Sequence, residues 1–420
     1  MKRFMRPIKW LSMLLPATFV DDAERFLYFR MPTVAAIALC RVFRHKQRGE
    51  APEEILVVRL DGLGDCVMTL PLLDELRRCY PFATISVAVQ SSWATLFDGS
   101  PSVDHVFPLE RLKPAHLPSA ARNLYSCLSF YLRFLKGRSF DLVVNPRWDA
   151  DYYLATMLCG LTLAPVAVGY EDRTSPLKIE QNWGFQRAYN LVVDAGPPLH
   201  EVQRNLGVLR ALGYEPQDTF PEIGVSEEHR RRAREWLGDL SGGFLLVLGL
   251  PAASAHRRWD TEHYIELLRL LKQSDKLSPV MIADEATLPM AEAVRTEFKE
   301  VRIAFGLSFP DTAAVIGVCD VYVGMDSGLA HVAAGLGRQT IVISPHPQGG
   351  DPEHYNSPGR FRPYGMTAIV VQPPGRPPEC AASCVSSEPH CILDITPAEV
   401  AAIIRARRKL VLGCAPMLER

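Results

Sequence analysis

The sequence lacks the features that mark several common protein classes. Its 420 residues carry 46 Lys and Arg against 47 Asp and Glu, so no net charge draws the chain toward nucleic acid. No run approaches the roughly 18–20 apolar residues that a membrane-spanning helix needs. No G-x-G-x-x-G fingerprint is present, which counts against a nicotinamide or flavin dehydrogenase, and no P-loop is present either. The length suits two domains and an appendage.

A disulfide framework is also lacking among the ten cysteines. Scattered cysteines in apolar surroundings are typical of buried free thiols in a reducing compartment. Six cysteines lie singly in apolar or helical stretches: Cys40, Cys66, Cys79, Cys127, Cys159 and Cys319. We therefore expect a cytoplasmic protein with free thiols.

Residues 1–50 are predicted to form a basic amphipathic extension. They hold ten Lys and Arg against four Asp and Glu, interleaved with Trp, Phe and Leu. This mixture is typical of a helix that lies on an anionic membrane, which would place the protein on the inner face of the cytoplasmic membrane. The alternative is a pair of helices that pack on the first domain or on another subunit.

The rest of the chain alternates β and α segments in two stretches, which predicts parallel, doubly wound sheets of the α/β class. We expect one domain over 51–225 and a second over 226–420, with a cleft where the carboxyl ends of their strands face each other. Residues 345–378 are rich in Pro and Gly and are expected to form extended loops, followed by a closing helix at 397–410. The predicted strands are 55–60, 84–89, 103–107, 141–145, 165–169, 244–250, 279–283, 301–304, 321–323 and 339–343.

Each domain contains a strand-to-helix turn with polar residues. In the first, Gly62 and Gly64 permit close approach to the backbone, and Asp65 falls at the start of a helix expected over 65–80. Asp65 could act in catalysis or simply cap that helix.

The second turn gathers Asp326, Ser327, Gly328 and His331 at another helix start. Asp326 and Ser327 could cap this helix, while its free amides and dipole face a diphosphate or a sugar. His331 lies one turn further along, as a ligand-facing residue or as a satisfied interior histidine.

A basic loop precedes the second turn in the sequence. Arg257 and Arg258 stand just before Trp259, after the first strand of the second domain. Arginine there could neutralise charge that develops on a departing phosphate, or it could be a solvated loop charge.

In their order along the chain, which is glycine turn, basic loop and second turn, these three segments resemble glycosyltransferase family 9, the ADP-heptose:lipopolysaccharide heptosyltransferases, over about residues 55–405. The closest matches are 55–73, 257–264, 323–336 and 361–365. The resemblance implies the GT-B fold, with two Rossmann-like domains around a cleft. It also implies an inverting glycosyltransferase that moves heptose from ADP-heptose to the lipopolysaccharide core.

The resemblance also implies roles for individual residues. Asp65 takes the position of the base that activates the acceptor hydroxyl, and Arg257 matches the basic donor-binding residue, with Arg258 beside it. Glu285 falls near the place of an acidic residue by the nucleotide ribose. The remaining donor-binding positions are Asp326, Ser327, Gly328 and His331. We expect acceptor contacts from loops at 91–100 and 148–153.

One departure from the family leaves the donor open. Residues 252–255 read Ala-Ala-Ser-Ala, where family members that use ADP-heptose often carry more hydroxyl groups. Three alternatives remain: another sugar nucleotide and acceptor, a sugar-nucleotide epimerase of the same fold, and a non-catalytic scaffold.

No cofactor and no metal ion are expected, and the nucleotide sugar is a substrate. The Asp-x-Asp at 149–151 imitates a metal signature of single-domain transferases, but a GT-B cleft stabilises the diphosphate with amides and basic side chains. Cys380, Cys384, Cys391 and Cys414 could in principle assemble a metal site, although paired C-x2-C spacing is missing.

Overall fold

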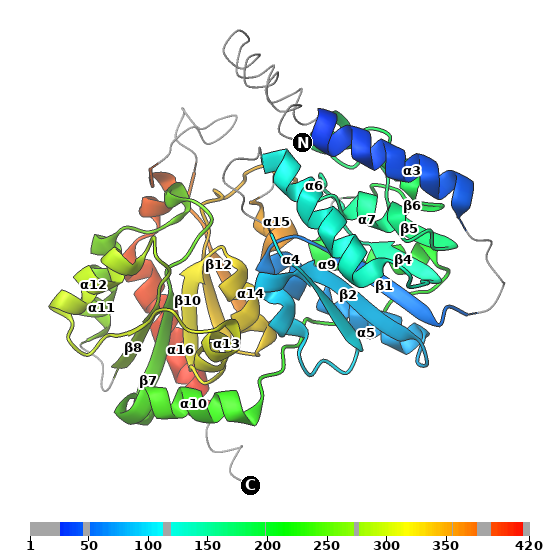
Figure 1. Cartoon of the computed structure of the whole chain (residues 1–420). Helices are drawn as coiled ribbons and strands as arrows, with labels where there is room; N and C mark the ends of the chain where they lie inside the picture. Colours follow the sequence, from blue (N-terminus) through cyan, green and yellow to red (C-terminus); the bar gives the residue numbers. More distant parts are fainter. Residues whose placement is uncertain are drawn as a thin grey trace, which may run out of the picture.

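The computed structural model contains two six-stranded parallel sheets, each with its own helices (Figure 1). The α/β class with two doubly wound parallel sheets is thereby confirmed. The structure describes residues 26–44, 51–111, 119–197, 199–272, 277–354, 356–375 and 388–414.

The first sheet has the strand order β3-β2-β1-β4-β5-β6. Its strands are β1 (Glu54–Arg59), β2 (Thr84–Gln90), β3 (His105–Leu109), β4 (Leu142–Asn145), β5 (Val166–Tyr170) and β6 (Leu191–Val193). The helices of this half are α4 (Leu63–Val67), α5 (Leu70–Cys79), η2 (Ser91–Phe97), α6 (Ser119–Phe130), η3 (Tyr131–Leu135), α7 (Ala155–Leu161), α8 (Pro176–Asn182), η4 (Phe185–Ala188) and α9 (Glu201–Ala211).

The second sheet has the order β12-β11-β10-β7-β8-β9, which is the same topology counted from β7. Its strands are β7 (Phe244–Gly249), β8 (Leu277–Ile282), β9 (Arg302–Ala304), β10 (Val321–Met325), β11 (Gln339–Ile343) and β12 (Ala368–Val371). Its helices are α10 (Glu227–Leu237), η5 (Gly238–Gly242), η6 (Ala255–Arg257), α11 (Thr261–Leu271), α12 (Leu288–Glu297), α13 (Phe309–Gly317), α14 (Gly328–Gly335), α15 (Pro358–Phe361), η8 (Cys391–Asp394) and α16 (Pro397–Cys414).

Both sheets reverse their direction of winding at one point, between β1 and β4 in the first and between β7 and β10 in the second. The loops that leave these strands diverge to opposite faces of the sheet, and the crevice between them is where doubly wound sheets bind ligands. The two predicted glycine turns follow β1 and β10, so each lies at a switch point.

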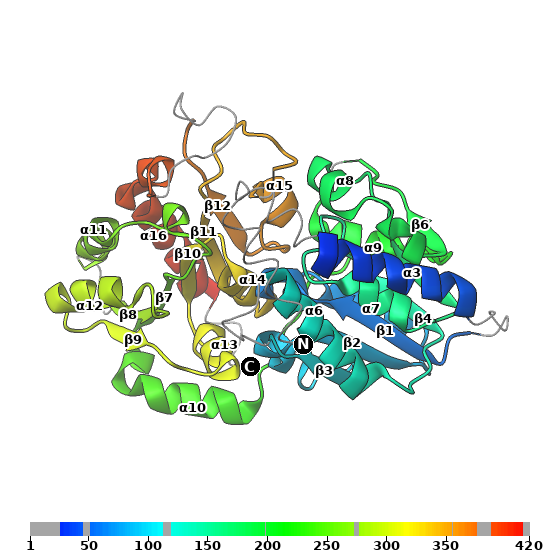
Figure 2. The same cartoon turned by 45° about the horizontal axis from the view of Figure 1, so that its top comes forward.

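Alternate residues of a strand point to opposite faces of its sheet. Ile55 and Val57 of β1 pack in one cluster with α5 and α9, whereas Leu56 and Val58 pack in another with α6 and α7. All four side chains are fully buried, because helices cover both faces (Figure 2). A parallel sheet covered in this way explains why its strands read as continuous apolar runs.

The core of the first half continues into that of the second. The cluster that contains α5 and α9 also contains Leu245 and Val247 of β7 and the apolar residues of α13 and α14. Helices α4 and α14 are in direct contact, as are η2 and α13. Helices from the two halves therefore pack against each other next to the two glycine turns.

Two expectations about local structure were wrong, and one strand was missed. The helix expected over 65–80 is two helices, since α4 ends at Val67 and α5 begins at Leu70 with Pro71 in its first turn. Proline has no N–H to continue an existing helix but fits the start of a new one. The region 345–378 is not all loop, because it contains α15 and β12, and β6 was not expected at all.

The expectation that no segment approaches membrane-spanning length was also wrong. Residues Phe26–Phe43 form an 18-residue helical segment with mean hydropathy 1.4, of which 22% is buried. It consists of η1 (Phe26–Arg30) and α3 (Met31–Phe43). Length and composition alone would let it cross a bilayer. In the structure α3 packs along α7 of the first half, as one of the two interpretations of residues 1–50 required.

Candidate active site

A cavity of about 1060 Å³ opens between the two halves, at the carboxyl ends of their central strands. Its lining includes most of the residues singled out from the sequence. These are Gly62, Gly64, Asp65, Arg257, Asp326, Ser327, Gly328 and His331. The two turns, which are more than 250 residues apart in the chain, therefore share one cavity.

The carboxylate of Asp65 is held from two sides. Its Oδ1 accepts a hydrogen bond from Arg59 at 2.9 Å, and its Oδ2 accepts one from the Gly62 N–H at 3.2 Å. The second bond is helix capping, since Asp65 is the third residue of α4. The side chain still keeps 23% of its surface exposed and lines the cavity. Capping and a chemical role are thus compatible at this residue.

Arg59 belongs to a buried chain of alternating charges that continues from Asp65. Its Nε lies 3.2 Å from the Asp61 carboxylate, whose other oxygen lies 2.6 Å from Arg147. Burial alone would lower the pKa of Arg147, but the surrounding carboxylates, Asp61 foremost, raise it above its usual value. Arg59 and Asp61 are buried, and both Arg59 and Arg147 line the cavity. This series of ion pairs fixes the orientation of the Asp65 carboxylate.

The second turn is organised by an ion pair. Arg257 Nη2 lies 2.7 Å from Asp326 Oδ2 and 2.9 Å from its backbone oxygen, which ties the basic loop to the end of β10. Burial raises the pKa of Asp326, and Arg257 opposes that rise. The buried Arg257 Nε has no hydrogen-bond partner within the described part of the chain. Arg257 therefore lines the cavity with one N–H donor that is not satisfied by the described residues.

Helix α14 begins without a side-chain cap. Ser327 occupies the N-cap position, but its hydroxyl makes no capping hydrogen bond, so the expected capping by Asp326 or Ser327 is absent at this helix start. The first amides of an α-helix need acceptors, and its dipole favours an anion there. The start of α14 and Arg257, which is paired with Asp326, together place N–H donors at one corner of the cavity.

His331 lies across the interface between the halves. It is buried, and a Cβ placed on Gly64 would come within 3.0 Å of its ring. Reciprocally, a Cβ on Gly328 would come within 2.7 Å of Leu63. Burial lowers the pKa of His331 to about 3, so the ring is neutral at physiological pH. The glycines of each turn thus make room for side chains of the other.

Two predicted donor-binding residues do not reach the cavity. Arg258 donates to the backbone oxygen of Ala252 at 2.9 Å, and Glu285 is exposed. Both are described residues, and neither is part of the cavity lining. Asp284, next to Glu285, lines it instead.

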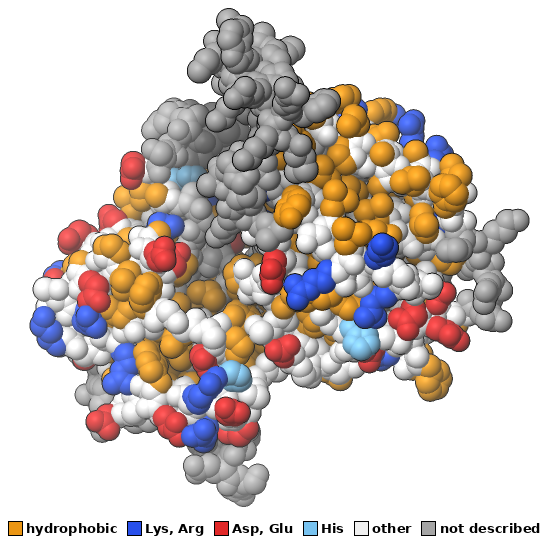
Figure 3. Space-filling view, viewed as in Figure 1, with side chains coloured by type: hydrophobic (Ala, Val, Ile, Leu, Met, Phe, Trp, Pro, Cys, Tyr) orange, Lys and Arg blue, Asp and Glu red, His pale blue; other side chains and the backbone are white. Residues whose placement is uncertain are grey.

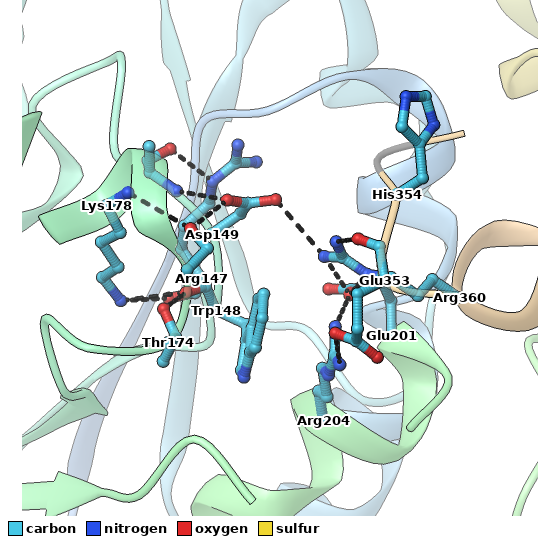
Figure 4. Close-up of polar contacts among 12 residues, drawn as sticks. Arg147, Trp148, Asp149, Thr174, Lys178, Glu201, Arg204, Glu353, His354 and Arg360 are labelled. Atoms are coloured by element: carbon cyan, nitrogen blue, oxygen red, sulfur yellow. Dashed lines mark hydrogen bonds and ion pairs between the residues drawn. The ribbon is translucent and has the colours of Figure 1, made fainter. Parts of the chain in front are cut away.

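The two loops expected to contact an acceptor both reach the cavity. Ser92 and Trp93 come from η2, and Trp148, Asp149 and Tyr152 come from the loop after β4. The second loop is anchored from below by Lys178, whose Nζ donates to the Trp148 backbone oxygen at 3.1 Å (Figure 4). Burial lowers the pKa of Lys178 to about 8.

An ionic cluster closes one wall of the cavity and joins distant parts of the chain (Figure 4). Glu201 at the start of α9 lies 2.7 Å from Arg204 and 2.8 Å from Arg360 of α15, and all three are buried. The two guanidinium groups lie 3.8 Å and 4.8 Å from the ring centroid of Trp148. Arg204 also pairs with Glu353 at 2.9 Å.

The two aspartates of the Asp-x-Asp sequence, Asp149 and Asp151, bind other protein groups. Asp151 accepts backbone N–H groups at the start of α7, while Asp149 accepts from Ser175 and pairs with Arg360. Among the described residues no group of three or more His, Cys, Asp and Glu side chains is placed to hold a metal ion. Cys380, Cys384 and the side chain of Cys414 lie outside the described part, and Cys391 forms no disulfide bond with another described cysteine.

The six scattered cysteines are free, as predicted, and five of them are buried while Cys79 is half-buried. Reasoning from the sequence gave Arg59 no role, although it begins the segment of the first glycine turn, and missed Arg147 altogether. A signal was present for Arg59, because a charged residue that ends a buried apolar strand just before a glycine turn requires partners. No local signal marks Glu201 and Arg360, which lie 159 residues apart.

Comparison with known proteins identifies the family. Residues 132–379, more than half of the chain, match the family described as glycosyltransferase family 9 (heptosyltransferase). The chain belongs to glycosyltransferase family 9. Lipopolysaccharide heptosyltransferase 3 of Escherichia coli is 23% identical over 289 residues, which cover 67% of this chain and 80% of that protein. Lipopolysaccharide heptosyltransferase 2 of Escherichia coli K12 is 26% identical over 310 residues, covering 69% and 82%.

Solved structures of the family share this architecture. The family 9 glycosyl transferase from Veillonella parvula superposes with a TM-score of 0.65 at 17% identity, over 86% of this chain and 97% of that one. Escherichia coli heptosyltransferase WaaC with ADP gives 0.63 at 20% identity, over 84% and 99%. The expected GT-B fold is confirmed, and this family 9 member is a glycosyltransferase.

Proposed function

We propose that the protein is an inverting transferase that moves heptose from ADP-heptose to a lipopolysaccharide-core sugar, with Asp65 as the general base. The observation that carries the proposal is the single cavity that contains both Asp65 and the N–H donors of Arg257 and the start of α14. The two relatives compared above are named lipopolysaccharide heptosyltransferases, and one solved relative holds ADP. The half at 51–225 would bind the acceptor, and the half at 226–420 the nucleotide sugar.

The reaction follows from the geometry. The Asp65 carboxylate takes the proton from an acceptor hydroxyl, and that oxygen attacks the anomeric carbon of the donor sugar. The bond from the anomeric carbon to the diphosphate breaks, and the configuration of that carbon is inverted. Negative charge that develops on the departing diphosphate meets Arg257 and the uncapped amides of α14. These groups supply the stabilisation, so neither a cofactor nor a metal ion is needed in this scheme.

One observation favours a second candidate for the donor. Ala252 and Ala253, which stand where hydroxyl residues are frequent, both line the cavity. Without hydroxyl groups there, fewer hydrogen bonds reach the donor from this loop, so another sugar nucleotide of similar size is the second candidate. Mass spectrometry of the products from a panel of nucleotide sugars separates the two. Incubation of each donor alone tests for an epimerase, which would alter the donor without an acceptor.

The substitution Asp65→Asn tests the base directly. The amide oxygen can still accept the Gly62 N–H, so α4 keeps its cap, but the side chain can no longer take a proton. We expect kcat to fall by about 10²- to 10⁴-fold while donor affinity, measured by calorimetry with ADP, stays unchanged.

A matched control is Asp260→Asn. Asp260 caps α11 by accepting the His263 N–H at 2.9 Å and does not line the cavity. This variant should keep wild-type kcat, because Asn caps a helix about as well as Asp. Full transfer by a folded Asp65→Asn protein that binds ADP would exclude Asp65 as the base.

A further inference from the structure

The helical segment 26–43 exposes a large apolar face. Seven of its bulky apolar side chains are solvent-exposed, among them Val42 with 73% of its surface accessible. The seven are Phe26, Leu27, Met31, Val34, Leu39, Val42 and Phe43. A soluble surface rarely gathers so many large apolar residues on one helix, and such patches mark interaction sites.

Helices α6 and η3 extend the same face. Element α6 contacts η1, and together α6 and η3 expose Tyr125, Leu128 and Leu132. Figure 3 shows hydrophobic side chains gathered over α3 and α6 on this side of the molecule. We call these ten residues the apolar face.

The segments that carry the apolar face have charge of one sign. Segments 26–44 and 119–140, which carry it, contain seven Lys and Arg residues and no Asp or Glu. These are Arg30, Arg41, Arg44, Arg122, Arg133, Lys136 and Arg138. Apolar side chains combined with basic ones are the composition that binds the interface of an anionic bilayer.

The apolar face is connected to the acceptor side of the cavity. In α6, Asn123 Nδ2 donates to the backbone oxygen of Tyr152 at 3.2 Å, and Cys127 Sγ donates to that of Tyr153 at 3.1 Å. Tyr152 lines the cavity in the loop after β4. The helix that carries part of the apolar face therefore also supports the wall opposite the donor-binding half.

We propose that the apolar face is a membrane-docking surface that seats the first half on an anionic phospholipid bilayer. The inference rests on the proposed function in one respect: docking would bring the cavity to a lipid-anchored acceptor. A second copy of this chain fits less well, since a two-fold contact would bring the basic residues of these segments against those of the other copy. A spanning arrangement would require α3 to leave α7, where Thr33, Ala36 and Cys40 are buried.

The test measures binding of the full chain to vesicles that contain no acceptor. The protein should sediment with vesicles of phosphatidylcholine and phosphatidylglycerol, and less with phosphatidylcholine alone. The triple variant Phe26→Ser, Val42→Ser, Leu132→Ser should lose about tenfold or more in vesicle affinity. The control Phe82→Ser removes an equally bulky side chain, 99% exposed in the turn between α5 and β2, and should bind like wild type.

A second variant tests the charges. Arg41→Gln with Lys136→Gln should weaken binding at low salt, and the difference from wild type should shrink at high salt because ions screen exposed charges. Wild-type vesicle binding by the triple variant would overturn the proposal. So would a dimer in solution that the triple variant dissociates, or resistance of the bound wild type to alkaline carbonate, which indicates a spanning helix.

Activity assays separate this inference from the proposed function. With a water-soluble acceptor fragment, the triple variant should keep wild-type kcat/KM, whereas with acceptor embedded in vesicles its kcat/KM should fall about tenfold. A protein that binds vesicles through the apolar face but transfers no sugar would disprove the proposed function alone.

Discussion

Asp65 shows how one side chain can serve both the fold and the chemistry. Its two carboxylate oxygens point to different partners, the Gly62 amide within α4 and the Arg59 guanidinium at the end of β1. Arg59 is 1% exposed and its position is fixed by Asp61. A carboxylate held in this way loses little rotational freedom when it meets a hydroxyl group, which is the advantage of a preorganised base.

His331 gives a prediction at the same scale. Burial lowers its folded-state pKa to about 3, against about 6.5 for an unfolded histidine. Below pH 6.5 the unfolded chain therefore takes up a proton that the folded chain does not, so stability present above pH 6.5 is lost as the pH falls toward 3. Between pH 7.5 and 5 this residue should cost the wild type about 2 kcal/mol of unfolding free energy.

The measurement compares wild type with His331→Gln in urea denaturation at several pH values. The variant has no proton to take up at this position, so the difference in unfolding free energy between the two proteins should change by about 2 kcal/mol over that range. Curves that stay parallel from pH 7.5 to 5 would show that His331 does not remain neutral in the folded state.

At the scale of elements, the central strands were predictable because burial on both faces leaves an unmistakable apolar run, as in Ile55–Val58 of β1. Edge elements were harder, since β12 spans only four residues within a Pro- and Gly-rich region and β6 only three. The two turns that follow β1 and β10 were predictable from their closely spaced Gly and Asp residues. The reciprocal packing of α4 on α14 was not, because it depends on how the two halves meet.

That packing predicts the effect of Gly328→Ala. The new Cβ would lie 2.7 Å from the Cβ of Leu63, close to the backbone of α4, so the two helices must move apart. Misplacement by a fraction of an ångström at the start of α14 should lower kcat/KM by about ten- to a hundredfold. Steady-state kinetics measure this effect, and small-angle X-ray scattering reports any separation of the halves.

The control glycine is Gly317, at the end of α13. A Cβ there would lie 3.9 Å from Leu336, which is ordinary contact, so Gly317→Ala should keep its activity and gain up to about 1 kcal/mol of stability. If Gly328→Ala were as active as Gly317→Ala, close contact between the two turns would not be needed for transfer.

At the scale of the whole molecule, the ionic cluster around Glu201 and Arg360 is a contact that no local sequence pattern predicts. Arg360 lies between β11 and β12 of the second sheet in the sequence, yet its guanidinium group lies against Glu201, Asp149 and the ring of Trp148, all of which belong to the first half (Figure 4). Buried charges are costly unless paired, so this cluster favours the arrangement in which the halves stay together. It thereby holds the acceptor wall in register with the donor-binding half.

A double-mutant cycle measures that link. Arg360→Met alone leaves Glu201 buried with Arg204 as its remaining partner, and should cost about 3 kcal/mol of unfolding free energy. Combined with Glu201→Gln, the loss should be smaller than the sum of the single losses by about 1–3 kcal/mol, because the two side chains contact each other.

The exposed pair Arg231–Glu235 supplies the comparison for this cycle. Its charged atoms are also in contact, at 2.6 Å, but both side chains are about 60% exposed on α10. Solvent screens such a pair, so its coupling free energy should stay below about 1 kcal/mol. Equal coupling free energies in the two cycles would mean that burial does not strengthen the interaction between Arg360 and Glu201. The apolar contact between α4 and α14 would then hold the two halves together without this ion pair.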